Sequence, residues 1–332
     1  MKNHFIAALS AGLFFLSSCH KADVNSEAFN NDDDNTPAVF ARGRCASYEV
    51  LDAQLKSDPL LRRRMDDIEL FTRQFQQKRY AQRLSLDTMI VPVVVNVLYR
   101  TAAENISLAQ IQSQIDVLND DFTGTNTDVN KIPTLFGSVK AGDTKIRFVL
   151  DQVIRKSTSK TSWSTNDAMK KSNRGGINPT SPTTKLNLWC CTMGGSILGY
   201  AQFPGGSSST DGVVILNRAF GSRTKFAGGY YTSTYDLGRT ATHEVGHWLN
   251  LRHIWGDSNC GNDLVDDTPL HTGANYGCPA ANTPSSCSGT PVMMTMNYMD
   301  YTDDACMYMF TTLQKTRMQA TYAVGGPRAS FR

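Results

Sequence analysis

The sequence has little excess charge, few histidines and no apolar run long enough to cross a membrane. Its 332 residues carry 33 lysines and arginines against 30 acidic residues, a net charge of +3, and the basic residues form no stripe interleaved with aromatics. We therefore expect no nucleic-acid partner. No stretch reaches the roughly 20 apolar residues that a transmembrane helix requires. No internal repeat is present, so a repeat architecture is not expected, and only six histidines occur.

The first 19 residues have the form of a bacterial lipoprotein signal peptide. A short polar start, Met1–His4, precedes an apolar run from Phe5 to Leu16 that is too short to span a bilayer. Small residues then precede Cys19, where cleavage would leave a lipidated N-terminus; the alternative is an ordinary signal peptide with an incidental cysteine. We predict a lipid-anchored protein on the bacterial outer membrane or cell surface, with a processed form released outside the cell.

Two segments separate the signal peptide from the main domain. Residues 20–42 are polar and nearly free of large apolar groups, which predicts a disordered tether. Residues 43–85 are predicted to be a prosegment, in which Asp58 and Pro59 begin a helix with apolar residues at helical spacing. Basic runs on the other face of this helix are either a solvated surface or a site where peptidases cut.

Residues 86–332 predict one α/β domain with two subdomains, which we expect to be monomeric. Ser107 caps a predicted helix, another begins near Asp236 before a loop-rich half, and a last one begins near Thr311. Residues 195–206 are a loop or an edge strand. Runs of β-branched residues predict further strands at 90–99, 146–150, 185–189 and 212–216.

Three of the six histidines fall within residues 243–253, and their spacing indicates a zinc site. His243 and His247 are four apart, so on a helix both rings lie on one face and point to one metal ion. Glu244 lies beside them, where it polarises a water without being a ligand. His253 becomes a third ligand if the helix stops and the chain turns back. Asn250 lies where this turn must occur, in a left-handed conformation that costs about 1 kcal/mol.

The eight cysteines divide by position. Cys190 and Cys191 are neighbours on a predicted strand and should stay reduced, facing opposite sides. Cys45 stands beside arginines, which favour a thiolate and hence a zinc ligand that keeps the enzyme latent; the alternative is a spare thiol. Four cysteines in the loop-rich half predict two disulfides, and their spacing does not choose among three pairings: Cys260, Cys278, Cys287 and Cys306.

These residues resemble the pappalysin family of metzincin zinc peptidases, in its bacterial ulilysin-like branch. The resemblance covers about residues 86–322 and rests on residues 243–253, Asp266-Asp267-Thr268-Pro269, Asn297-Tyr298-Met299-Asp300-Tyr301 and Cys306-Met307-x-x-Phe310-Thr311. It implies an α/β metzincin-like catalytic domain. A twisted mixed sheet and long helices form its upper subdomain, the zinc helix crosses the cleft floor, and the lower subdomain is loop-rich and disulfide-bonded. Asn250 is the main departure, because the family signature has Gly there.

The resemblance also implies roles, position by position. One catalytic zinc would be held by His243, His247 and His253. Glu244 would be the catalytic base, Met299 the residue of the Met-turn below the metal, and Tyr301 a stabiliser of the oxyanion. The disulfides would be Cys260–Cys287 and Cys278–Cys306. A calcium ion would be bound by Asp263, Asp266 and Thr268. Latency of family type would rest on the prosegment thiol, Cys45.

The expected activity is hydrolysis of peptide bonds in proteins and peptides. Zinc lowers the pKa of a water, and Glu244 takes its proton and passes it to the leaving amine. We expect the substrate to extend along the strand at 198–203. A basic residue after the cleaved bond is preferred if Asp303 or Asp304 lines the pocket.

Two alternatives accompany this prediction. Another metzincin branch, astacin-like or serralysin-like, is disfavoured by Trp248, by the cysteine-rich loops and by the Asp-Asp-Thr-Pro motif. The second alternative is a non-catalytic surface lipoprotein with a structural zinc site. Structural sites are usually closed by a fourth protein ligand, and the candidate near the helix is Cys45, which belongs to a removable segment.

Overall fold

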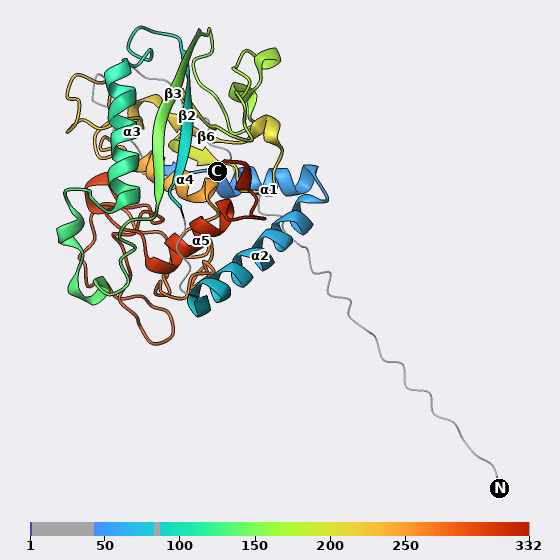
Figure 1. Cartoon of the computed structure of the whole chain (residues 1–332), viewed down its shortest axis with the longest axis vertical. Coiled ribbons are helices and arrows are strands. Elements are labelled where there is room, and N and C mark those ends of the chain that lie inside the picture. The colour runs from blue at the N-terminus through green and yellow to red at the C-terminus, as the bar shows by residue number, and fades with distance from the viewer. Residues whose placement is uncertain (2–42, 83–86, 332) are drawn as a thin grey trace. The chain divides into compact units, whose positions relative to one another are not determined.

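A mixed sheet forms the centre of the fold in the computed structural model (Figure 1). Its strands lie in the order β1-β5-β6-β4-β2-β3; β5 runs antiparallel to β6, and the other neighbours are parallel. The structure describes Met1, residues 43–82 and residues 87–331, so Cys19 and the predicted tether lie outside the described residues. The strands are β1 Arg44–Cys45, β2 Met89–Tyr99, β3 Ile146–Ser157, β4 Leu186–Cys191, β5 Ile197–Ala201 and β6 Val213–Leu216.

Strand β2 lies inside the sheet and is buried on both faces. Val93, Val94 and Val95 are fully buried in succession, which is why its sequence is a continuous apolar run rather than an alternating one. Pro92 lies just before the Val93–Val97 segment that pairs with β4, so it has a strand neighbour on one side only. A residue without an N–H is tolerated at such a position.

Capping residues set the bounds of two helices. Helix α3 begins after Ser107, whose hydroxyl accepts the N–H of Gln110, and ends at the left-handed Gly124 (φ 68°). Helix α5 begins after Thr311, which forms a capping box with Gln314. The α-helices are α1 Ser47–Ser57, α2 Leu61–Gln82, α3 Leu108–Thr123, α4 Arg239–Trp248 and α5 Thr312–Tyr322. Short 3₁₀ helices lie at Val129–Lys131, Thr134–Phe136, Ala168–Lys170, Ser172–Arg174, Ser208–Thr210, Asn217–Ala219, Asp304–Cys306 and Ala329–Phe331.

The strands predicted from β-branched runs are present, and residues 195–206 contain β5. Helix α1 was not predicted. The helix expected at Asp58 begins at Leu61, with the Asp58 carboxylate accepting the N–H of Leu60 at 3.1 Å. The histidine helix begins at Arg239 rather than near Asp236, because Gly238 is left-handed (φ 86°) and ends the preceding turn.

The chain between α4 and α5 has little regular structure and is crosslinked. Disulfides join Cys260 to Cys287 and Cys278 to Cys306, the pairing that the resemblance implies. Cys190 and Cys191 are free and fully buried on β4. Within the described residues, no helix is both long and apolar enough to cross a bilayer. The mixed sheet, the helix below it and the disulfide-bonded loops agree with the predicted metzincin-like α/β fold.

Residues 43–82 pack against the rest of the described chain rather than apart from it. Strand β1 adds to the sheet beside β5, and helix α2 lies along α5 (Figure 1). The described residues from 43 onwards belong to one compact unit. The boundary at residues 85 and 86 between a prosegment and a catalytic domain stays a prediction.

Candidate active site

Helix α4 carries the first two histidines and is buried along its whole length. Its cap position is occupied by Gly238, which has no side chain to cap the helix. Instead, the Asp304 carboxylate accepts the backbone N–H groups of Leu237 and Arg239 at 2.8 and 3.2 Å. A negative group at this end also suits the helix dipole. Asp304, 65 residues away in sequence from Arg239, therefore fixes the start of the helix.

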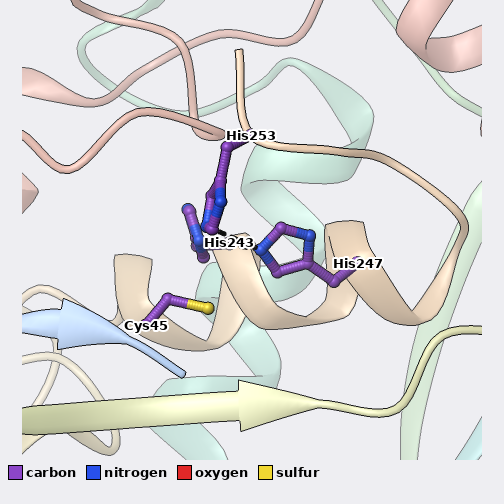
Figure 2. A group of neighbouring side chains, drawn as sticks. All are labelled: Cys45, His243, His247 and His253. Carbon is purple, nitrogen blue, oxygen red and sulfur yellow. Dashed lines mark hydrogen bonds between the residues drawn. The ribbon is translucent and has the colours of Figure 1, made fainter. Parts of the chain in front are cut away.

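Three imidazole rings meet on one side of α4 (Figure 2). The Nε2 atom of His247 lies 3.1 Å from the Nε2 atoms of both His243 and His253. Each ring is held by its other nitrogen, as is usual for metal-ligating histidines. The Nδ1–H of His243 donates to Tyr298 O at 2.7 Å. That of His247 donates to Leu251 O at 2.8 Å, and that of His253 donates to Asp257 Oδ1 at 2.5 Å.

The donor set of this cluster fits a zinc ion. Because each Nδ1 donates to an oxygen, each Nε2 can present a lone pair to the shared centre, and lone pairs at such distances repel unless a cation lies between them. Burial, with repulsion from His253, lowers the pKa of His243 to about 3 and that of His247 well below its usual value, so both rings are neutral at pH 7. Neutral imidazole nitrogens are common zinc ligands.

Asn250 makes the turn that brings His253 back to the helix. Its φ is 71°, the left-handed conformation that the sequence predicts. The side chain is buried, and its Nδ2 has no hydrogen-bond partner. The carbonyl oxygen accepts the Nε–H of Arg317 at 2.7 Å. The backbone of this turn is therefore anchored, while its side chain contributes an unsatisfied donor.

Replacing Asn250 should change stability according to backbone conformation. We expect Asn250→Gly to raise the free energy of unfolding by about 0.5–1 kcal/mol, because Gly relieves left-handed strain and removes an unpaired donor. Asn250→Ala should lower it by about 1 kcal/mol, because Ala tolerates positive φ less well. Urea denaturation of the metal-free full-length protein measures both. A Gly variant less stable than the wild type would show that the Asn side chain stabilises the turn.

Met299 lies directly beneath the histidine helix. It is fully buried, and its carbonyl accepts the N–H of Ile254, next to His253, at 3.1 Å. A Cβ atom at Gly246 would lie 2.5 Å from the Met299 sulfur, so only glycine permits this approach. The soft thioether thus packs against the helix backbone one residue before His247, as a residue of the predicted Met-turn would.

Cys45 of β1 points into the histidine cluster (Figure 2). Its sulfur and the ligating nitrogens of the three histidines all lie within 4.8 Å of one another. The predicted influence of neighbouring arginines is wrong for Arg44, whose guanidinium pairs with Glu49. Burial and the Glu244 carboxylate raise the pKa of the Cys45 thiol. A cation among the histidines is therefore what would hold this sulfur as a thiolate.

Glu244 faces the same sulfur. Its Oε2 lies 3.3 Å from Cys45 Sγ and accepts the Ser47 hydroxyl at 2.9 Å. Burial raises the pKa of the carboxyl to about 8, although the hydrogen bonds from Ser47 and Cys45 act in the opposite direction. Behind it, a Cβ at Gly199 would lie 3.0 Å from Glu244 Cγ, so β5 contacts this side chain closely. Glu244 thus lies beside the three histidine Nε2 atoms and is not one of the candidate metal ligands.

Tyr301 also reaches the segment that covers the histidines. Its hydroxyl donates to the Cys45 carbonyl at 3.1 Å, and its ring packs edge-on against His253 with centroids 4.9 Å apart. On another side of His253, the Trp255 ring is stacked at 4.3 Å. The Tyr301 hydroxyl therefore already donates to a carbonyl oxygen of the β1 segment, which lies across the histidines.

The edge of strand β5 that faces away from β6 pairs with the same segment. Ser196 O accepts the N–H of Arg44 and Gly199 O accepts the N–H of Ala46, both at 3.0 Å. The N–H of Ala201 donates to Ser47 Oγ at 2.8 Å. An extended segment of the chain itself thus adds to β5, while the addition of a substrate to this edge stays a prediction. In this structure the added strand is β1, which runs parallel to β5.

Only some of the remaining predicted residues lie where their predicted roles require. Asp304 is buried and lines a cavity beside Glu244, whereas Asp303 is partly exposed and is not among the lining residues. Asp263 is buried, and both its carboxylate oxygens accept the Thr268 hydroxyl, at 3.0 and 2.9 Å. Asp266 is exposed. The structure thus brings Asp263 and Thr268 together without Asp266 at their contact.

Four residues of the site escaped the sequence analysis: Ser47, Asp257, Asp304 as a helix cap, and Arg317. Asp257 alone carried a local signal, because it lies four residues after His253. Ser47, Asp304 and Arg317 act across long sequence separations that no local pattern encodes.

Comparison with known proteins places this geometry in a family. The pregnancy-associated plasma protein-A peptidase family matches residues 197–323. An extracellular metalloprotease of Pyricularia oryzae is 34% identical over 246 residues, which are 72% of this chain and 75% of that protein. One of Colletotrichum graminicola is 34% identical over 286 residues, 77% of this chain and 89% of that protein.

Two solved structures are more similar still in sequence. Mature mirolysin of Tannerella forsythia, in complex with a cleaved peptide, is 44% identical with a TM-score of 0.70, covering 74% of this chain and 96% of that one. A mutant of promirolysin from the same organism is 40% identical with a TM-score of 0.76, covering 87% and 96%. These matches favour the predicted branch over the astacin-like and serralysin-like ones. The chain belongs to the pappalysin family of zinc metalloproteases.

Proposed function

We propose that this chain is the zymogen of a zinc endopeptidase in which His243, His247 and His253 hold the metal and Glu244 is the catalytic base. The observation that carries the proposal is the convergence of three histidine Nε2 atoms beside a buried carboxylate. Bound zinc supplies a Lewis acid that lowers the pKa of a water and polarises the scissile carbonyl.

The roles of the other groups follow from what they contact in the full chain. Glu244 lies 3.3 Å from the Cys45 sulfur, so a water in place of that sulfur is within reach of proton transfer. Glu244 takes this proton and returns it to the leaving amine. Tyr301, whose hydroxyl now binds the Cys45 carbonyl, donates to the oxygen that becomes negative during attack. The β5 edge holds the substrate extended.

Latency is proposed to rest on the segment from 43 to 85. Cys45 would take the fourth ligand position around the metal. Ser47 forms hydrogen bonds with the Glu244 carboxylate and with the backbone of β5. The segment would therefore block the open metal position, the catalytic base and the strand that binds substrate. The solved precursor of the similar protein covers more of this chain than its mature form does. A non-catalytic protein with a structural zinc site would instead keep Cys45 in place permanently.

Location and further ligands extend the proposal. The relatives are extracellular, and residues 1–19 predict export; lipidation at Cys19 supplies the membrane anchor. Calcium in the loop after α4 is proposed on Asp263, Asp266 and Thr268, of which Asp263 and Thr268 are in contact. A basic residue after the cleaved bond is proposed because Asp304 lines the cavity beside Glu244.

Metal removal tests the proposed activity directly. We expect the activated protein to cleave a peptide library, to lose all cleavage after a zinc chelator is added, and to regain it with one zinc per chain. Peptides with Lys or Arg just after the cleaved bond should be overrepresented among the products. Cleavage that persists in a protein shown to hold no metal would contradict the proposal, and calcium re-addition alone serves as the control.

A further inference from the structure

Arg317 of α5 is a buried cation that connects three parts of the chain. Its side chain is 1% exposed. Its Nε–H donates to Asn250 O at 2.7 Å, in the turn between α4 and His253. Its two terminal nitrogens donate to the Glu69 carboxylate of α2 at 2.9 and 2.5 Å. One guanidinium therefore joins α2 of the predicted prosegment to the turn that delivers a zinc ligand.

The Glu69 contact has the geometry of a binding site for a carboxylate. Two parallel N–H donors match its two oxygens, which is the strong bidentate arrangement of arginine and carboxylate. Glu69 is itself only 16% exposed, so the pair is screened little by solvent. The hydrogen bond from Arg317 Nε to Asn250 O fixes the orientation of the guanidinium, so that both terminal nitrogens face α2.

Apart from a weaker charge interaction of Glu69 with Arg252, the other described contacts of α2 with the domain lack this charge pairing. Arg64 donates to Gly205 O at 2.7 Å, and Arg79 donates to Gln319. Phe71 packs near Gly325, where an added Cβ would lie 3.3 Å from its ring. These interactions shape the surface, whereas loss of the Glu69 charge with α2 in place would leave the buried Arg317 guanidinium without its bidentate partner, which is strongly unfavourable.

We propose that Arg317 forms a carboxylate-binding site that anchors α2 through Glu69, independently of Cys45, and that its occupancy stabilises the Asn250 turn. The ligand class is a carboxylate presented by a helix, and Glu69 is its occupant in the full chain. The prosegment thus has two anchors, one at the histidine cluster and one on the far side of the turn that carries His253. This inference rests on the proposed function only in treating residues 43–85 as a prosegment.

Hydrogen–deuterium exchange in the full-length protein tests this without measuring catalysis. We compare the wild type with Glu69→Gln, with Cys45→Ala and with the double variant. Asp67→Asn is the control, because Asp67 is an exposed carboxylate on the same helix. Glu69→Gln should speed exchange of α2 amides at least about tenfold, the scale expected for losing a bond between charged groups. Exchange of amides 251–254 should rise with it.

The outcomes separate the two anchors. If they are independent, Glu69→Gln raises α2 exchange by the same factor with Cys45 present or replaced. Equal exchange in Glu69→Gln and Asp67→Asn would overturn the proposal, as would a response of α2 without any response of residues 251–254. Glu69→Asp, which keeps the charge, should recover part of the protection, and it remains informative if the Gln variant is poorly folded. Because no turnover is measured, failure here leaves the catalytic assignment of Glu244 untouched.

Discussion

Glu244→Gln is expected to lower casein cleavage by the activated protein by orders of magnitude while leaving one zinc per chain. Glutamine keeps the size and a hydrogen-bonding oxygen of the side chain but cannot accept a proton from water. General base catalysis contributes roughly 10²- to 10⁴-fold, so the turnover rate should fall by that factor. Initial rates on casein, with zinc content measured by mass spectrometry of the same samples, give both quantities.

A second buried glutamate provides the matched control for this variant. Glu104 is 7% exposed, and its carboxylate accepts the N–H of Arg100 at 2.6 Å in a turn after β2. Glu104→Gln removes a buried negative charge without touching the histidine cluster, so it should retain most activity. Unchanged casein cleavage in Glu244→Gln would refute the base assignment. Loss of zinc together with activity would instead make Glu244 a structural support of the metal site.

Cys45→Ala is expected to release activity in the uncleaved chain. The substitution removes the sulfur from the fourth position of the cluster but keeps Ser47 on Glu244 and β1 on β5, so release should be partial. We expect casein cleavage by the full-length protein to rise roughly tenfold or more, since tenfold corresponds to only about 1.4 kcal/mol. Cleavage is measured before any prosegment is removed, as checked on gels.

Cobalt substitution identifies the sulfur ligand by a separate signal. A thiolate bound to cobalt gives an intense charge-transfer band in the near ultraviolet, which the wild-type full-length protein should show and Cys45→Ala should lack. Cys191→Ala, which removes a buried thiol on β4, should keep both the band and latency. A Cys45→Ala protein that stays fully latent would mean that the segment acts by covering the cleft alone.

The histidine spacing predicted most of the candidate site because the chemistry is local. Residues His243 and His247 share a helix face by periodicity alone, and Asn250 is among the few residues that tolerate the left-handed turn the third histidine needs. The strands of the sheet were likewise predictable, because β-branched runs buried on both faces leave a direct trace in the sequence.

Contacts between distant segments were not predictable in this way. Ser47 reaches Glu244 across 197 residues, and Asp304 caps a helix whose own cap residue is Gly238. Such pairs depend on how the sheet, the helix and the loops are assembled, and a serine or an aspartate in a loop has many ordinary roles. Helix α1 was missed for a related reason: only three of its residues are buried, so its apolar periodicity is weak.

The disulfide at Cys306 bears on how firmly the histidine helix is held. Cys306 ends the 3₁₀ helix that starts with Asp304, and Cys278 ties that short helix to a distant loop. Asp304 in turn holds the first turn of α4. Reduction of the Cys278–Cys306 bond removes that tie, so we expect the reduced protein to hold the first turn of α4 less firmly.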